Sequence, residues 1–208
     1  MRVVAIDGPV GSGKSTVAKA VADRLGLDCL NTGAMYRAVA VAVLRRGVTG
    51  QSRPGEVDGS ELVAVAHSLD IELDDDRVVV DGEDVTDEIR TPEVGRMVSV
   101  VAAVPEVRAL LVLLQRDWVA ARGGAVVEGR DIGSVVFPDA ELKVFLTATP
   151  EERARRRQDE DADDVRRRDR IDASRAASPL VEPEGAVVID STGRSVEEVV
   201  DEIVGLLR

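Results

Sequence analysis

Gly8-Pro9-Val10-Gly11-Ser12-Gly13-Lys14-Ser15 has the pattern G-x-x-x-x-G-K-S, and this stretch decides the fold. It follows a β-branched run, residues 3–6, that predicts a buried strand. It precedes an amphipathic run, residues 17–25, that predicts a helix ending at Gly26. A loop of small residues in this position lets consecutive backbone N–H groups converge on a phosphate, and the N-terminus of the helix favours the same negative charge. The stretch therefore predicts a phosphate-binding loop.

Each polar residue of this loop has an expected task. Lys14 would reach the β- and γ-phosphates of a nucleotide, and the hydroxyl of Ser15 would ligate Mg²⁺. The alternative is a glycine-rich turn between a strand and a helix that happens to carry an exposed lysine. The nucleotide-binding residues that we expect are Gly8, Pro9, Val10, Gly11, Ser12, Gly13, Lys14, Ser15 and Thr16.

Composition limits the possible functions. The 208 residues suit one large or two small domains, and 44% apolar residues suffice for a core. A net charge of −12 argues against a nucleic-acid or anionic-membrane partner. One cysteine and one histidine exclude a disulfide framework and a cysteine or histidine metal cluster. Since no apolar run approaches a membrane span and no signal-peptide pattern opens the chain, we expect a cytoplasmic protein without a membrane partner.

Short strands alternate with helices along the chain. After the first strand, apolar runs at 27–30, 125–128, 142–146 and 186–189 predict four more. This alternation predicts a three-layer α/β fold with a mostly parallel five-stranded sheet. Residues 71–85 differ, because apolar residues alternate there around an Asp81-Gly82 tight-turn signal. We therefore expect a small antiparallel insert.

Polar residues follow two of these strands. Thr32, Tyr36 and Arg37 come after the second strand, and Arg130 and Asp131 come after the third. Ligands of open α/β sheets bind beyond the carboxyl ends of the strands, so these side chains would face the same cleft as the phosphate loop. For Arg37 the alternative is an ordinary surface arginine.

Two further sets of polar residues lie on predicted helices. Ser99 and Arg108 flank a helix break at Pro105 and are either site residues or solvated positions. Thr149 and Glu152 have the spacing of a capping box, and nine arginines and nine acidic residues follow between 151 and 175. This charged segment is either a solvated helix or a lid that brings arginines over phosphates.

The chain also carries several longer motifs. They are Thr-Gly-Ala-Met-Tyr-Arg at 32–37, the run at 84–94, the Ser-x-Val-Ala-Ala-x-Pro-x-Val-Arg string at 99–108, the Gly-Arg-Asp run at 129–140, and Arg168, Asp172 and Arg175 before Ser-Pro-Leu at 178–180. Together these motifs resemble those of one family, the bacterial cytidylate (CMP/dCMP) kinases. The resemblance covers nearly the whole chain. It implies transfer of the γ-phosphoryl group of ATP to CMP or dCMP, with ATP and Mg²⁺ as cofactors.

The resemblance also implies roles for individual residues. Ser99, Arg108, Asp131 and Arg175 would serve the cytosine, Arg168 and Asp172 the sugar hydroxyl, and Arg37 and Arg130 the α-phosphate, with Thr32 and Tyr36 beside them. A carboxylate near the base is reasonable, because the cytosine amino group is a donor that uracil and thymine lack. The residues expected to neutralise charge in catalysis are Lys14, Arg130, Arg153 and Arg157.

The family organisation implies a kinase core at residues 1–47 and 96–208, with a lid at about 153–172, and a monophosphate-binding insert at 48–95. Only ten residues separate Arg157 from Arg168, which is a short lid for this family. We expect a monomer. The alternatives to a cytidylate kinase function are another small-molecule kinase on the same scaffold, a GTPase-like switch, and a nucleic-acid binder. The chain lacks the Asn-Lys-x-Asp string of guanine readers, and its acidic residues balance the arginines of the charged segment.

Overall fold

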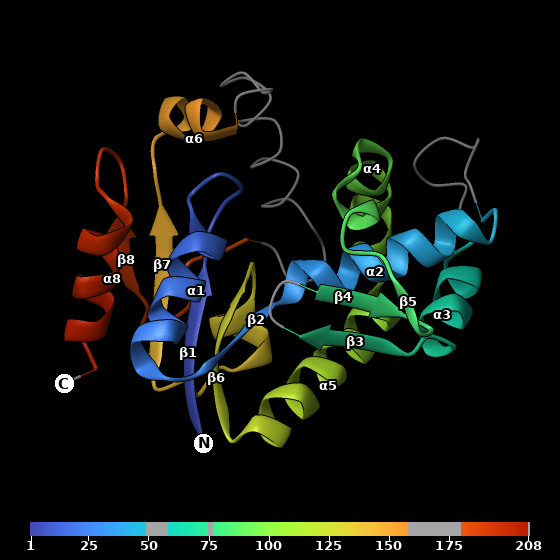
Figure 1. Ribbon diagram of the computed structural model, residues 1–208, viewed down its shortest axis with the longest axis horizontal. Coiled ribbons are helices and arrows are strands. Elements are labelled where there is room, and N and C mark those ends of the chain that lie inside the picture. The colour runs from blue at the N-terminus through green and yellow to red at the C-terminus, as the bar shows by residue number, and fades with distance from the viewer. Residues whose placement is uncertain (49–57, 75–76, 158–179, 208) are drawn as a thin grey trace. The chain divides into compact units, whose positions relative to one another are not determined.

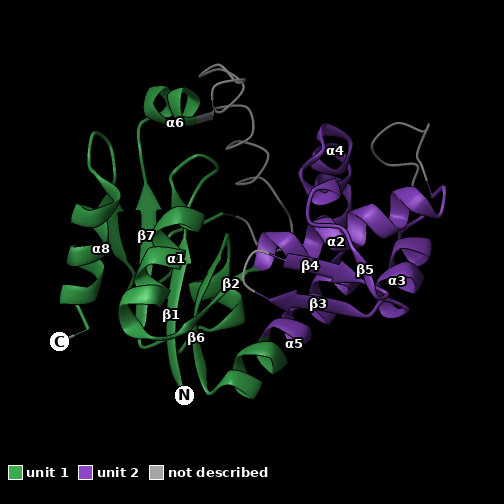
Figure 2. Cartoon of the chain, viewed as in Figure 1, with its two compact units in different colours: residues 1–31, 116–208 green, residues 32–115 purple. Residues whose placement is uncertain are grey.

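The computed structural model describes residues 1–48, 58–74, 77–157 and 180–207 (Figure 1). The chain forms two compact units, which are coloured separately in Figure 2. The first unit contains residues 1–31 and 116–208, and the second contains residues 32–115. Each unit is described by itself.

The first unit is built on a parallel sheet. Its strands are β1 (Arg2–Asp7), β2 (Asp28–Asn31), β6 (Gly124–Gly129), β7 (Leu142–Thr147) and β8 (Val187–Asp190), in the order β2-β6-β1-β7-β8. The predicted α/β fold with a five-stranded parallel sheet is confirmed. Asp7 at the end of β1 is in register with Gly129 of β6 and Phe145 of β7. The segments that follow these strands therefore emerge side by side at one edge, which we call the carboxyl edge.

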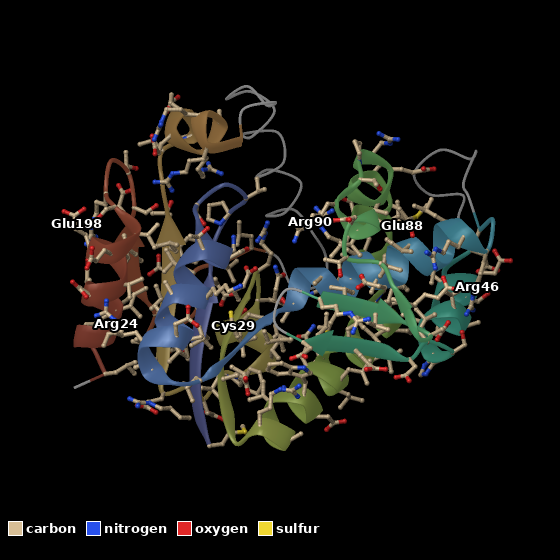
Figure 3. All side chains as sticks on the ribbon, viewed as in Figure 1. Arg24, Cys29, Arg46, Glu88, Arg90 and Glu198 are labelled. Carbon is tan, nitrogen blue, oxygen red and sulfur yellow. The ribbon has the colours of Figure 1, made fainter. Side chains whose placement is uncertain are left out.

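Helices α1 (Lys14–Leu25) and α8 (Val196–Gly205) cover one face of this sheet (Figure 1). Val21 of α1 and Ile203 of α8 pack with Ile6 of β1 in a fully buried cluster. Arg24 of α1, labelled in Figure 3, pairs with Asp201 of α8 at 2.9 Å. Residues 3 and 5 of β1, which alternate with this cluster, are buried as well, so both faces of the sheet are covered.

Two helices begin with the sequence spacing of a capping box, and the structure forms only one of the boxes completely. At α8 the box is complete, because Ser195 Oγ accepts from the Glu198 amide at 3.2 Å and the Glu198 carboxylate accepts from the Ser195 amide at 2.8 Å. At α6 (Pro150–Arg157) only half is present, with the Glu152 amide donating to Thr149 Oγ1 at 3.3 Å. The amide of Thr149 donates to Thr192 instead, because the Glu152 carboxylate is bound by arginines of its own helix.

The second unit combines helices with a small antiparallel sheet. Its helices are α2 (Thr32–Arg45), α3 (Gly59–His67), α4 (Pro92–Val101) and the first part of α5 (Pro105–Arg122), with a short 3-10 turn, η1 (Glu88–Arg90). Its sheet has the order β3 (Ile71–Asp74), β4 (Arg77–Val80) and β5 (Glu83–Asp84). Asp81 and Gly82 have φ values of 51° and 81°, which is the conformation of a tight hairpin turn. The predicted antiparallel insert is confirmed.

The compact second unit is larger than the insert expected at 48–95, because it includes α2 and the helical residues up to 115. The predicted domain boundaries remain a proposal.

Of the helices in the described ranges, no single one is long and apolar enough to cross a membrane. Helices α4 and α5 reach that length and hydropathy only as a pair, and a bend of 102° separates them.

Candidate active site

The phosphate loop, Gly8–Ser15, lies between β1 and α1 as predicted. Its three glycines have φ values of 150°, 76° and 91°, which side chains rarely adopt. A Cβ atom on Gly8 would lie 2.0 Å from the carbonyl oxygen of Leu146, so the loop begins in close contact with the β7 backbone. Glycine is therefore required there both by conformation and by space.

The side chains of this loop bind its own backbone and the neighbouring strand. Lys14 is buried and its Nζ donates to the carbonyl of Pro9 at 2.8 Å, and Ser12 Oγ donates to the same carbonyl at 3.0 Å. Ser15 Oγ donates to Oε1 of Glu128 at 2.7 Å. Glu128 is a buried carboxylate at the end of β6. An ammonium group, a hydroxyl and a carboxylate thus meet at the carboxyl edge.

A second turn, residues 130–137, follows β6 beside the phosphate loop. It contains a π-turn, η2 (Ile132–Val136), in which the amide of Phe137 donates to the carbonyl of Ile132 at 2.7 Å. The carboxylate of Asp7 accepts from the amides of Ile132 at 2.8 Å and Gly133 at 2.7 Å. Such a turn leaves amides exposed at its start, and a carboxylate is their natural partner.

The other end of the 130–137 turn is held by Arg116 of α5. Its Nε donates to the carbonyl of Val136 at 2.9 Å, and its Nη2 donates to the carbonyl of Val135 at 3.0 Å. A guanidinium group can satisfy two carbonyls at once because its donors form a planar fork. The turn is therefore fixed at both ends by side chains from other elements.

Burial raises the pKa of Asp7 from its ordinary value of 3.8 to about 6. The two amide hydrogen bonds favour the ionised form but do not offset the loss of solvation. Of the nearby charges, Asp131 raises this pKa further and Lys14 lowers it. Asp7 therefore interacts electrostatically with both the lysine of the phosphate loop and the aspartate of the neighbouring turn.

The predicted site residues Arg130 and Asp131 begin this second turn. Arg130 is half-buried, and its Nη1 lies 3.3 Å from the carbonyl of Gly129. Asp131 is buried, and its carbonyl accepts from the amides of Val135 and Val136. The structure thus places Arg130 and Asp131 beside the phosphate loop, because β1 and β6 are neighbours in the sheet.

The predicted lid arginines have separate outcomes. Arg153 is buried, and it donates to the carbonyls of Ala148 at 3.0 Å and Val10 at 3.2 Å. Arg157 is the last residue of α6, and its side chain is outside the described part of the structure. Three more predicted site residues and most of the expected lid also lie outside the described residues. These are Arg168, Asp172 and Arg175.

Two of the predicted substrate residues in the second unit contact each other. The guanidinium of Arg108 lies over the Tyr36 ring, with its central carbon 5.3 Å from the ring centroid. Arg108 is buried and also donates to the carbonyl of Ala102 at 3.2 Å. An arginine fixed against an aromatic ring in this way has a defined orientation.

The other predicted residues of this unit lie on α2 and α4. Arg37 donates to the carbonyl of Ile89 in η1 at 2.8 Å, so it is joined to the 84–94 run. Thr32 is buried at the start of α2, whereas Ser99 is exposed on α4. The structure therefore groups Tyr36 with Arg108, and Arg37 with η1, without grouping Ser99 with either.

Sequence reasoning missed three polar residues at the carboxyl edge, namely Asp7, Glu128 and Arg156. The first two end strongly apolar strand runs, and a buried carboxylate requires a partner. That signal could have found them. Arg156 donates to the carbonyl of Ser12 at 3.1 Å, but in the sequence it is one of four arginines within five residues, and no local pattern separates it from the others.

A parallel sheet with this loop after its first strand defines the class of P-loop NTPase folds. A gluconokinase from Sinorhizobium meliloti has the same fold, with a TM-score of 0.53 at 17% identity over 99% of this chain and 91% of that one. A shikimate kinase from Acinetobacter baumannii has a TM-score of 0.50 at 12% identity, over 100% and 93%. At these identities the likeness shows the fold alone.

The particular family follows from sequence comparison. The cytidylate kinase family model matches residues 4–208. The cytidylate kinase of Pelotomaculum thermopropionicum is 51% identical, over 97% of this chain and 93% of its own length. That of Mycobacterium leprae is 46% identical, over 99% and 95%. The chain belongs to the cytidylate kinase family, and the predicted resemblance is confirmed.

Proposed function

We propose that the phosphate loop binds ATP and that the 130–137 turn forms part of the CMP or dCMP site. The γ-phosphoryl group of ATP is then transferred to CMP or dCMP, giving ADP and CDP or dCDP, which is the reaction of a cytidylate kinase. The observation that carries this proposal is the register of Asp7 with Gly129, because the phosphate loop and Arg130 directly follow these two residues of adjacent strands.

The donor side of the site is the phosphate loop. Its backbone N–H groups and the N-terminus of α1 are suited to the phosphates of ATP. Lys14, which donates to the carbonyl of Pro9, can turn its ammonium group to the β- and γ-phosphates. The three positive-φ glycines hold the loop in this shape.

The residues present fit Mg²⁺ as a cofactor of ATP. Ser15 Oγ would ligate it, with the carboxylate of Glu128 as an oxygen partner 2.7 Å from that hydroxyl. Among the described residues no group of three or more His, Cys, Asp or Glu could hold a metal ion. Mg²⁺ often binds proteins through one or two oxygen ligands together with substrate phosphates. When bound, it neutralises phosphate charge.

The acceptor side combines charge with base recognition. Arg37 and Arg130 would bind the α-phosphate, and Asp131 would accept a hydrogen bond from the cytosine amino group. Tyr36 and Arg108 already contact each other and would provide a fixed surface near the base. Further members of this proposed site are Thr32, Ser99, Arg168, Asp172 and Arg175.

Catalysis needs alignment and charge neutralisation rather than a strong base, because the acceptor phosphate oxygen is already ionised. Lys14, Arg130 and Arg157 are the residues that we propose for the transferring group. Arg153 is the fourth residue of this set, and its guanidinium donates to the Val10 carbonyl of the phosphate loop. A closed lid would exclude water, the competing acceptor.

We also propose that the protein is a monomer and that it is located in the cytoplasm, in keeping with its single cysteine.

An acceptor panel tests this function. ADP release from ATP is measured with CMP, dCMP, UMP, AMP, GMP and shikimate at equal concentrations, with and without EDTA. We expect CMP or dCMP to give the highest kcat/KM and EDTA to abolish the reaction. A preference for AMP, GMP or shikimate would instead support another small-molecule kinase on the same scaffold.

A further inference from the structure

Arg156 of α6 contacts three separate segments of the first unit. Its Nε donates to Oε1 of Glu152 at 2.9 Å on its own helix. Its Nη1 donates to the carbonyl of Ser12 at 3.1 Å, and its Nη2 donates to the carbonyl of Ser191 after β8 at 2.8 Å. One guanidinium group thus joins the helix, the phosphate loop and the segment that follows the edge strand.

The carbonyl of Ser12 requires these donors. A phosphate loop turns N–H groups toward the ligand, so some of its carbonyls point the other way. Ser12 is fully buried, and a buried carbonyl without a donor is costly. Besides Arg156, the hydroxyl of Ser191 lies 3.0 Å from this oxygen, but it lies equally close to the carbonyl of Thr147. A hydroxyl has one hydrogen to donate, so Arg156 is the donor that can serve Ser12 whichever carbonyl Ser191 chooses.

The orientation of Arg156 is itself fixed. The Glu152 carboxylate is paired with Arg155 and Arg156, and these hydrogen bonds lower its pKa to about 2. It is therefore ionised throughout the physiological range. A Cβ atom on Gly13 would lie 3.4 Å from Nη1 of Arg156, so the guanidinium group packs directly against the peptide that precedes Lys14.

We propose that Arg156 is a positioning residue that holds the phosphate loop in its ATP-binding shape through the carbonyl of Ser12. It acts on a different carbonyl from Arg153, which binds Val10. This inference rests on the proposed role of Gly8–Ser15 as the ATP site. It makes the affinity for ATP depend on α6 and on Ser191.

Arg155 supplies a matched control. It is the preceding residue on the same helix, it carries the same charge, and it also pairs with Glu152, but its side chain is 73% exposed. Binding of a non-hydrolysable ATP analogue is measured by calorimetry for Arg156→Gln and Arg155→Gln, together with KM for CMP. We expect Kd to rise about 10- to 100-fold for Arg156→Gln, because this substitution removes a charge-assisted hydrogen bond to a buried carbonyl. We expect about a twofold change or less for Arg155→Gln.

Further variants separate positioning from simple destabilisation. Arg156→Lys keeps the charge without the planar fork and should give an intermediate Kd while the apo protein stays folded by circular dichroism. Ser191→Ala combined with Arg156→Gln should weaken binding by more than the product of the two single effects, because each single variant leaves the Ser12 carbonyl one donor and the double variant removes both. KM for CMP should stay within about threefold of wild type, which a general loss of structure would not allow.

Two results would overturn the inference: equal ATP affinity of the Arg156→Gln and Arg155→Gln variants, or equal loss of ATP and CMP binding in Arg156→Gln. Lys14→Met distinguishes this failure from failure of the proposed site. If Lys14→Met binds the ATP analogue as wild type does, the phosphate loop is not the ATP site. If Lys14→Met loses binding and Arg156→Gln does not, only the role of Arg156 is refuted.

Discussion

The turns that follow β1 and β6 lie side by side but owe their shapes mainly to different features. The phosphate loop after β1 owes its backbone conformation chiefly to three glycines of its own with positive φ, and arginines of α6 add contacts to its carbonyls. The 130–137 turn after β6 takes its shape from two distant side chains, Asp7 and Arg116. A contiguous pattern therefore reveals the first turn, whereas the support of the second becomes visible only once the chain has folded.

The largest effect should come from the backbone of the first turn. Gly8→Ala would place a Cβ atom 2.0 Å from the Leu146 carbonyl at a φ of 150°, and neither backbone can yield cheaply. We expect a loss of about 3–5 kcal/mol in the free energy of unfolding, measured by urea denaturation. Gly26→Ala is the control, because Gly26 has a φ of 64° with nothing within 4 Å of a Cβ, and it should lose about 1 kcal/mol. Equal losses would mean that close packing on β7 is unimportant.

The second turn should be sensitive through its side chains. Arg130→Ala removes a proposed phosphate contact without altering the turn, so we expect kcat for CMP phosphorylation to fall about 100-fold or more. Unfolding should be little changed. Val135→Ala tests whether any truncation in this turn has the same effect, because Val135 is 38% exposed and contributes its carbonyl to Arg116. Wild-type kcat in Arg130→Ala would remove this residue from the site.

Asp7 links the two turns, and its pKa gives a pH-dependent test. The pKa of Asp7 is about 6 in the folded protein and has its ordinary value of 3.8 in the unfolded chain. Between about pH 4 and pH 6 the folded protein therefore holds a proton on Asp7 that the unfolded chain has released. Stability from this residue is therefore fully present below about pH 4 and is lost as pH rises through about 6. The change is on the order of 2–3 kcal/mol.

Asp7→Asn should lack this dependence. The unfolding free energies of wild type and variant are compared by urea denaturation from pH 4 to pH 7.5, since other titrating groups cancel in the difference. Wild type should gain stability relative to the variant as the pH falls. A difference that stays constant with pH would show that Asp7 is not desolvated in this way.

The smallest effect should be at the glycine of the second turn. Gly133→Ala meets only side-chain atoms, with Cγ of Pro183 at 3.1 Å and Cδ of Lys143 at 3.2 Å, and the lysine chain can move aside. We expect a change of less than about 1 kcal/mol in the free energy of unfolding, obtained from the same denaturation curves. A loss as large as that of Gly8→Ala would abolish the contrast between the two turns.

Much of the fold was predictable because its signals are local. The strand before Gly8, the helix after Lys14 and the Asp81-Gly82 turn are each specified by neighbouring residues, and all three are confirmed. The half-formed box at Thr149 shows the limit of such reasoning. Glu152 has the right spacing, but two arginines of its own helix compete for its carboxylate.

The candidate site was predictable in part for the same reason. Arg130 and Asp131 follow a strand, so their place at the carboxyl edge could be expected, and Lys14 belongs to a contiguous pattern. The partner of Asp7 lies 125 residues away, and nothing near residue 7 indicates it. Arg45 of α2 is a similar case, since it pairs with Glu88 in η1, labelled in Figure 3, across 43 residues.

The bond from Asp7 to Ile132 also sets an order of assembly. The carboxylate ends the strand that carries the phosphate loop, yet the amides that satisfy it are synthesised more than a hundred residues later. Closing so long a stretch of chain is slow, and a desolvated carboxylate cannot be buried before its partners arrive. We therefore expect the end of β1 that carries the phosphate loop to reach its final form only together with the turn after β6.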